Sequence, residues 1–456
     1  MRHRLGTALV AAAALLAPAT GRTSELDVSS NTQLNAYQQW RNGALNSTVP
    51  LYEFLSLSGR EIAIPGGDLQ LVVDAWGGVD LASPLPWWNG YQNSGNWSGD
   101  LNLAYVQGSW LGGDLKLKLG RMSVGYGNSR MLQLDGGSLS ARIANLFTVD
   151  AYVGAPTIQR FMAYGNLYSA NPTVGNLAAG GRIGFASGQL LNVGASAGFA
   201  WDSGTATRED LALDLKVSPL SWMYLMGYLD YSLFAESYFS SFGSQVAEGT
   251  ASLVFPFTPH LQATVDYSYT VPSLLLPYNS ILWVFSDSTR QYVGLSGRLG
   301  LEQFGLKVPV DFDLSYRRVF ENAVDDGTTA GNRVSLGARW RAASAFTLGA
   351  EGAWLEVPSA ETWTGANSSY GFGRAYGTLS GYGVTGTLDF QGYWFTQPVN
   401  GQWSSLVGNA TLGYEVLSGL SVVGAVSGGA TPYYSSYFSG LVKIVYNQSY
   451  RSREVY

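Results

Sequence analysis

Apolar and polar residues alternate along much of this chain with a period of two, which is the pattern of a β-strand with one apolar face. In residues 261–270 every second residue up to Tyr269 is apolar or aromatic, and Gln, Thr, Asp and Ser stand between them. Residues 210–217, 308–317 and 333–341 alternate in the same way. The sequence therefore predicts many amphipathic strands, each with one charged or polar face.

Five of these runs end, bend within a few residues and begin again with the same alternation. They are 185–201, 215–231, 255–269, 340–354 and 414–428. Longer polar, Gly-rich and aromatic stretches lie between the bends, at 155–177, 202–207, 234–245, 271–288, 320–331 and 357–372. Short turns at one end and longer loops at the other are typical of a transmembrane β-barrel, with the short turns in the periplasm.

The predicted fold class is therefore all-β, a transmembrane antiparallel β-barrel. Alternating segments give about 22 candidate strands, and the length suits an even barrel of roughly 18 to 22 strands. The last predicted strand carries Phe438, Gly440, Val442, Ile444 and Tyr446 on one face. This aromatic-ended strand resembles the C-terminal assembly signal of outer-membrane barrels, and a short tail at 447–456 is expected to follow it.

Composition and the N-terminus add a location. Only 13% of residues are charged, about half the share of roughly 25% in soluble domains, yet no apolar run reaches the ~20 residues of a membrane helix. Arg2 and Arg4, an apolar stretch at 5–16 and Ala17-Pro18-Ala19 predict a signal peptide at 1–19, with cleavage after Gly21 as the alternative. Residues 20–456 then form a single barrel domain in the outer membrane of a Gram-negative bacterium. The 28 Tyr and 14 Trp suit its interfaces.

Other classes of function are disfavoured. The net charge is −6 without a Lys/Arg cluster, so nucleic acid is not an expected partner. There is no Cys, which excludes disulfides and a lipoprotein anchor, and beyond the signal only His260 remains, in a short turn. We therefore expect no enzyme, no cofactor and no metal site. A Gly-x-Gly-x-x-Gly match at 381–386 has strand-like sequence on both sides, so it indicates a hairpin or barrel wall rather than a nucleotide site.

The alternation places one set of charged residues inside the lumen, on five consecutive predicted strands. The set is Asp266, Arg298, Asp311, Asp313, Arg317, Arg333, Arg339, Arg341 and Glu351. One interpretation is a salt-bridge lattice that braces the wall. The other is a charged constriction that orients or selects an anionic solute. The two interpretations are compatible.

The segment at 117–137 reads LKLGRMSVGYGNSRMLQLDGG. It resembles outer-membrane channel families in which a strand ending in Leu-Gly-Arg is followed by a loop and then Leu-Asp-Gly, as in alginate-export-type and other polysaccharide-export barrels and in some proteobacterial porins. Met122 departs from that pattern, where a polar residue such as Gln often follows the Arg. The resemblance implies that Arg121, Arg130 and the downstream Arg142 lie near the pore lining, with Asp135 in the pore or its loop. The alternative is that Gly120-Arg121 only ends a strand.

Aromatic, Asn- and Gly-rich stretches at 86–97, 393–403 and 431–438 suit either carbohydrate or the aromatic belt of the membrane interface. The leading prediction is a passive outer-membrane channel, specifically for polysaccharide or oligosaccharide, and 155–177 is long enough to fold inward as a plug. The alternatives are an anion-preferring diffusion porin and a non-conducting surface scaffold or adhesin. Expected partners are outer-membrane lipid, the assembly machinery, periplasmic polysaccharide-export components and further copies of the chain.

Overall fold

The structure is a computed structural model that describes residues 25–41, 44–81, 97–125, 132–157, 177–202, 205–236, 241–242, 244–271, 289–323, 327–356 and 369–451. The described chain is almost entirely strand, with two short 3-10 turns, η1 (Leu111–Gly113) and η3 (Leu301–Phe304). No helix in these ranges is long and apolar enough to cross a membrane. The predicted signal peptide at 1–19 lies outside them.

The strands are β1 (Glu25–Arg41), β2 (Ala44–Thr48), β3 (Pro50–Ile64), β4 (Gly67–Asp80), β5 (Trp97–Trp110), β6 (Leu115–Val124), β7 (Leu132–Ile143), β8 (Phe147–Thr157), β9 (Leu177–Ser187), β10 (Leu191–Asp202), β11 (Thr205–Leu220), β12 (Met223–Glu236), β13 (Ser241–Phe242), β14 (Gln245–Thr258), β15 (Leu261–Thr270), β16 (Thr289–Gly300), β17 (Val310–Ala323), β18 (Gly327–Ala343), β19 (Phe346–Leu355), β20 (Tyr370–Gly381), β21 (Val384–Val399), β22 (Gln402–Leu417), β23 (Leu420–Thr431) and β24 (Tyr434–Arg451).

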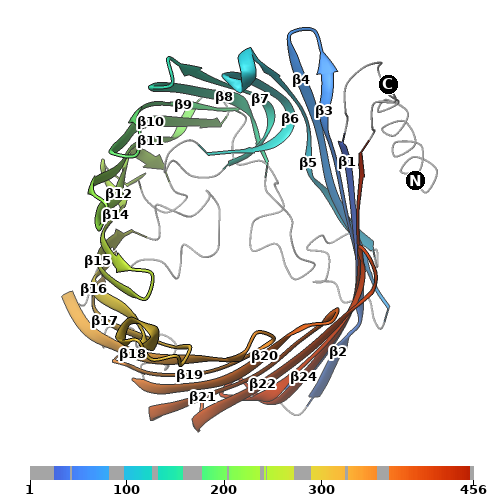
Figure 1. Cartoon of the computed structure of the whole chain (residues 1–456), viewed down its shortest axis with the longest axis vertical. Helices are drawn as coiled ribbons and strands as arrows, with labels where there is room; N and C mark the ends of the chain where they lie inside the picture. Colours follow the sequence, from blue (N-terminus) through green and yellow to red (C-terminus); the bar gives the residue numbers. More distant parts are fainter. Residues whose placement is uncertain are drawn as a thin grey trace.

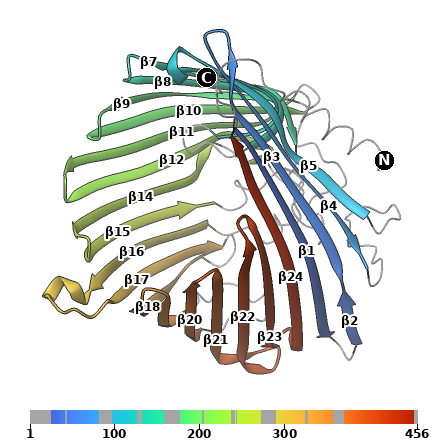
Figure 2. The ribbon, with the colours of Figure 1, turned by 45° about the vertical axis from the view of Figure 1, so that its right-hand side comes forward.

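Twenty-two of these strands form one closed antiparallel ring, in which each strand pairs with its neighbour in the chain and β24 pairs with β1 (Figure 1). The short strands β2 and β13 pair only with β1 and β12 and extend the rim. The strands run obliquely around the wall, as Figure 2 shows. The predicted antiparallel barrel and its upper strand count are confirmed.

All five predicted bends are hairpins, namely β9–β10, β11–β12, β14–β15, β18–β19 and β22–β23. Because successive strands are antiparallel, these turns share one end of the barrel, and the connections after β8, β15 and β19 lie at the other. We call these the short-turn end and the long-connection end. In outer-membrane barrels the short-turn end faces the periplasm.

The last strand is longer than its sequence pattern indicated. β24 runs through Tyr446 to Arg451, and its final residues pair with the start of β1, from Ser29↔Asn447 to Glu25↔Arg451. The predicted tail at 447–456 is therefore wrong for its first five residues. These polar residues lack the apolar alternation that marks a strand, but the closing partner β1 supplies their backbone hydrogen bonds.

The two faces of the wall differ in polarity. Large apolar side chains such as Leu295, Leu314 and Leu336 are 55–57% exposed on one face of neighbouring strands, and the residues between them are polar or charged. A closed barrel with an apolar outer face satisfies every ladder hydrogen bond within a bilayer. The protein is thus a transmembrane β-barrel of the bacterial outer membrane.

A row of glycines crosses the wall from β6 to β8. Gly120 pairs with Gly136, and Gly136 pairs with Gly154. A Cβ at Gly136 would stand 2.1 Å from the carbonyl oxygen of Val153, and one at Gly120 would stand 2.2 Å from that of Ala104. Only glycine fits so close to a neighbouring backbone. We call this row the glycine crease.

Candidate functional site

The nine charged residues predicted to face the lumen lie on one face of β15 to β19. They alternate with the outward apolar residues: Asp266 on β15, Arg298 on β16, Asp311, Asp313 and Arg317 on β17, Arg333, Arg339 and Arg341 on β18, and Glu351 on β19. Cross-strand register brings several of them directly together. Arg298 is opposite Asp313, Asp311 is opposite Arg339, and Arg317 is opposite Arg333.

Most of these arginines contact a carboxylate. Arg298 Nε lies 2.9 Å from Asp313 Oδ1, and Arg339 Nη2 lies 2.9 Å from Asp311 Oδ2. Arg317 and Arg341 make longer ion pairs, with N–O distances of 3.8 Å, to Asp266 and to Asp311. The pairs link neighbouring strands, so they brace this wall in the way the lattice interpretation requires.

Some guanidinium N–H groups on this face have no partner among the described residues. Arg333 is exposed and makes no ion pair with the part of the chain that the structure describes. Arg298 uses only Nε toward Asp313, and the Nε of Arg339 is buried without a described hydrogen-bond partner. Guanidinium groups with unused N–H donors bind carboxylates and phosphates well.

Two further charged residues extend the set, and the sequence analysis missed them. Arg374 on β20 donates through Nε to Asp389 Oδ2 on β21 at 2.9 Å, and its guanidinium lies 4.8 Å from the ring centre of Tyr376. Arg374 is also the direct cross-strand partner of Glu351. The signal was present, because Phe372, Arg374 and Tyr376 alternate with glycine and alanine, but that segment has no apolar stripe to reveal its two faces.

Arg298, Arg339 and Arg374 converge on one polar recess of 400 Å³ together with Asp313 and Glu351. We call these five residues and the recess the arginine pocket. Hydroxyl and amide groups complete its lining, from Gln262, Thr264, Ser296, Ser315, Ser335 and Tyr376. Asp311 and Asp389, just outside this lining, pair with Arg339 and Arg374. The recess is therefore a mixed array, in which Arg298 keeps N–H donors that can bind an additional anion.

Aromatic rings lie beside this pocket on the same two strands. Tyr370 and Phe372 on β20 pair across the strands with Phe395 and Tyr393 on β21. The ring centres of Phe372 and Tyr393 are 5.1 Å apart, and those of Tyr370 and Tyr393 are 5.9 Å apart. We call these four residues the aromatic patch. Tyr393 begins the aromatic stretch 393–403 noted in the sequence, and β21 continues through this stretch to Val399.

The Leu-Gly-Arg and Leu-Asp-Gly motifs pair with each other. Gly120 opposes Gly136 in the crease, and Arg121 opposes Asp135, which its guanidinium contacts twice, Nε–Oδ1 at 2.7 Å and Nη2–Oδ2 at 2.8 Å. By alternation, Arg121 and Asp135 share the outer face with Leu119. The inner face there carries Met122, Val124, Leu134 and Tyr152, which form a buried apolar cluster.

The remaining sequence candidates lie apart from the pocket. Arg142 ends β7 at the short-turn end, 3.8 Å from Asp114, and Arg130 lies outside the described residues, as do residues 86–96. The Gly-x-Gly-x-x-Gly segment forms the turn between β20 and β21. His260 lies in the turn before β15, with Nδ1 3.2 Å from Glu302 Oε2. Among the described residues, no group of three or more His, Cys, Asp or Glu is arranged to hold a metal.

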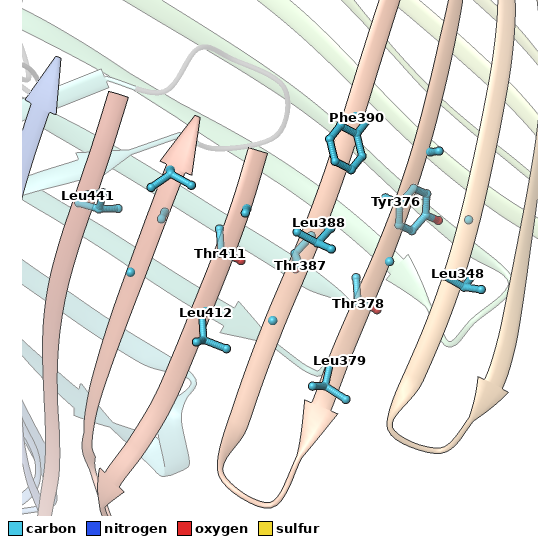
Figure 3. A pocket seen from close by; sticks show the side chains of 18 of the residues that line it. Leu348, Tyr376, Thr378, Leu379, Thr387, Leu388, Phe390, Thr411, Leu412 and Leu441 are labelled. Atoms are coloured by element: carbon cyan, nitrogen blue, oxygen red, sulfur yellow. The ribbon is translucent and has the colours of Figure 1, made fainter. Parts of the chain in front are cut away.

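A larger depression of 1260 Å³ lies on the apolar outer face and has no part in this site. Leu379, Leu388 and Leu412 line it on neighbouring strands, as Figure 3 shows. Gly377, Ala410 and Gly424 also line it, and these small residues leave room for the depression. Its lining is apolar and it belongs to the surface that contacts lipid.

No protein-family model matches this chain, and no curated protein matches it. Solved outer-membrane proteins resemble it in overall structure. OccK11 (OpdR) of Pseudomonas aeruginosa has 10% identity and a TM-score of 0.43, over 94% of this chain and 96% of that one. OccAB4 of Acinetobacter baumannii has 10% identity and a TM-score of 0.45, over 94% and 99% of the two chains. At this distance the likeness concerns the barrel fold alone.

Proposed function

We propose that this protein is a passive outer-membrane channel for small hydrophilic solutes, a diffusion porin that prefers anions. The arginine pocket carries the proposal, because Arg298 keeps unused N–H donors in this polar recess of the inner wall, and Arg333 on the same face makes no ion pair with the described residues. A barrel of 22 strands is wide enough to enclose a lumen beyond its own side chains. Charged rings and patches of this kind select ions in pores.

The paired carboxylates assist this function rather than cancel it. Asp313 and Asp389 each hold one arginine at a fixed point on the wall, so less side-chain freedom is lost when a solute binds. The unused N–H donors of Arg298 then face a solute that passes. An anion gains a charge-assisted hydrogen bond there, and a cation meets a locally positive surface.

Polysaccharide export has less support than the porin alternative. One of its motivations was the resemblance at 117–137, which implied that Arg121 lies near the pore lining, with Asp135 in the pore or its loop. By strand alternation these two residues lie on the outer face, where they form an ion pair beside the glycine crease. Periplasmic export components were expected only for export, so they are not part of this proposal.

The test is the reversal potential of the refolded mature chain in a planar bilayer under a KCl gradient. We expect steady current with anion preference, and we expect the double variant Arg298→Gln/Arg374→Gln to shift the reversal potential toward cations. Arg121→Gln is the matched control, because it removes an arginine from the outer face and should leave the potential unchanged. Cation preference in the unaltered protein would refute the selectivity. Absence of current would favour a non-conducting scaffold or adhesin.

A further inference from the structure

A polar network interrupts the apolar outer face of the barrel near the long-connection end. Arg318 on β17, Asn332 on β18 and Glu356, the residue after β19, follow one another across neighbouring strands. By alternation they share the outer face with the lipid-facing Leu314 and Leu336. An arginine on the lipid face of a barrel is costly at the bilayer midplane and tolerated only near the interfaces. Arg318 must therefore lie close to an interface.

The height of Arg318 matches the headgroup region of the outer leaflet. The outward apolar alternation of this segment includes Val308 and ends at Tyr316, which are 45% and 44% exposed. From Val308 to Arg318 the chain covers about 33 Å of strand. A strand tilted by about 40° rises about 25 Å over that length, which is the height of the apolar band. Tyr316 and Trp354 stand one step closer to this band, at the positions of an aromatic belt.

The guanidinium group of Arg318 is held in place by its neighbours. Its Nη1 donates to Asn332 Oδ1 at 2.9 Å, and the hydroxyl of Tyr316 donates to the same oxygen at 2.9 Å. Asn332 Nδ2 in turn donates to the carboxylate of Glu356, which fixes the orientation of the amide. The guanidinium also lies 5.7 Å from the ring centre of Phe320, a cation–π contact. Little side-chain freedom therefore remains to be lost when a ligand binds.

Most of the hydrogen-bonding capacity of Arg318 is unused. A guanidinium carries five N–H donors, and Arg318 uses Nη1 toward Asn332. It makes no ion pair with the part of the chain that the structure describes. The nearest carboxylate in this row, that of Glu356, belongs to a strand about 9.6 Å away at the usual strand spacing. An outward guanidinium with free donors suits a phosphate group, which accepts two parallel hydrogen bonds from it.

We propose that Arg318 binds a phosphate group of lipid A on the outer face of the barrel. Lipid A is the phosphorylated glycolipid that forms the outer leaflet of Gram-negative outer membranes, so its phosphates lie at the height of Arg318. Arg318 contacts the phosphate, Asn332 and Tyr316 position the guanidinium, and Trp354 borders the acyl chains. Basic side chains at this level of a membrane protein recognise anionic headgroups. The inference goes beyond the proposed channel function and does not depend on conduction, because the site lies outside the lumen.

The experiment is a thermodynamic cycle between Arg318 and the lipid phosphate, on the full mature chain refolded in detergent. Bound lipid is measured by native mass spectrometry over a concentration series of lipid A and of dephosphorylated lipid A. We expect lipid A to bind about tenfold more tightly than its dephosphorylated form, since one charge-assisted pair contributes on this scale. Arg318→Gln should remove that difference and leave the affinity for the dephosphorylated lipid unchanged, because this lipid has no phosphate for Arg318 to bind.

Arg333→Gln is the matched control for lipid binding. Arg333 follows Asn332 on β18, but by alternation it points into the lumen. This variant should keep the full preference for the phosphorylated lipid. Arg318→Lys keeps the charge without the planar fork, so it should keep part of the preference. The shift of unheated samples in gel electrophoresis shows that each variant is folded before its binding is compared.

Several outcomes would overturn the inference. One is an undiminished preference for the phosphorylated lipid in Arg318→Gln, and another is an equal loss of preference in Arg333→Gln. Phosphatidylglycerol that binds as tightly as lipid A would mean that the site accepts any anionic headgroup. Inorganic phosphate that displaces lipid A would mean a general anion site. Either of these two results would overturn the assignment to lipid A.

Discussion

At the scale of single residues, arginine–carboxylate pairs have two roles in this barrel, and the face of the strand decides between them. Arg121 and Asp135 bond twice on the outer face, where the pair joins β6 to β7 beside the glycine crease. Arg298 and Asp313 bond once on the inner face and leave donors unused. A residue's chemistry therefore does not give its function here until its side of the wall is known.

The glycine crease gives a prediction at this scale. In Gly136→Ala the new methyl group would stand 2.1 Å from a backbone carbonyl oxygen, and a backbone atom in a sheet cannot move aside cheaply. We expect a loss of about 1–3 kcal/mol in the free energy of unfolding, measured by urea denaturation of the refolded barrel in detergent.

Gly137→Ala is the control for this variant. Its nearest neighbour would be the flexible side chain of Leu119 at 3.2 Å, so we expect a change within about 0.5 kcal/mol. Equal stability of the Gly136 and Gly137 variants would show that the wall can relax at this point, and that the crease is not held by steric exclusion.

At the scale of elements, the seam between β1 and β24 completes the ring. A barrel has no free edge only if its first and last strands pair, and here they pair over sixteen registered positions. The last part of the seam is polar. Ser449 donates to Asp27 at 2.5 Å, and Ser29 donates to Asn447 at 2.6 Å.

Truncation tests the contribution of this polar segment. Deleting 447–456 removes five strand positions and both side-chain hydrogen bonds, and each hydrogen bond contributes about 1 kcal/mol net. We expect a smaller folded fraction, measured by the shift of unheated samples in gel electrophoresis. Deleting only 452–456 removes no described pairing and should fold like the full chain. Equal folding of the two truncations would mean that the seam is already closed at Tyr446.

Sequence alone predicts the strands of this fold better than it predicts the register between them and the side chains that pair across them. Period-two alternation and short turns are local, so the strands and all five hairpins could be predicted. The pairing of Arg374 with Asp389 depends on register between two strands whose inner face mixes aromatic and charged residues, and no apolar stripe marks it. The face on which Arg121 lies could be assigned only once the register at the glycine crease was known. The end of β24 could be assigned only from its pairing with β1.

At the scale of the whole molecule, the barrel wall separates lipid from the lumen, and each strand presents side chains to both. β20 presents Leu379 to the lipid-facing depression and Arg374 to the arginine pocket. The lumen wall over β15 to β21 is a mixed array, whose inward positions carry seven arginines and six carboxylates. Selectivity from such a small excess must act through the field of fixed charges over a short range, which makes it sensitive to salt.

Ionic strength provides the last prediction. The Debye length falls from about 30 Å at 0.01 M salt to about 3 Å at 1 M, so fixed guanidinium groups act on ions across the lumen only in dilute salt. We expect the anion preference, measured as reversal potential over a series of KCl concentrations, to weaken steadily as salt rises. The Arg298→Gln/Arg374→Gln variant should begin with less preference and depend less on salt. A preference that persists unchanged in concentrated KCl would mean that anions are selected by direct contact within the pocket, and the field of the wall would then have no part in selection.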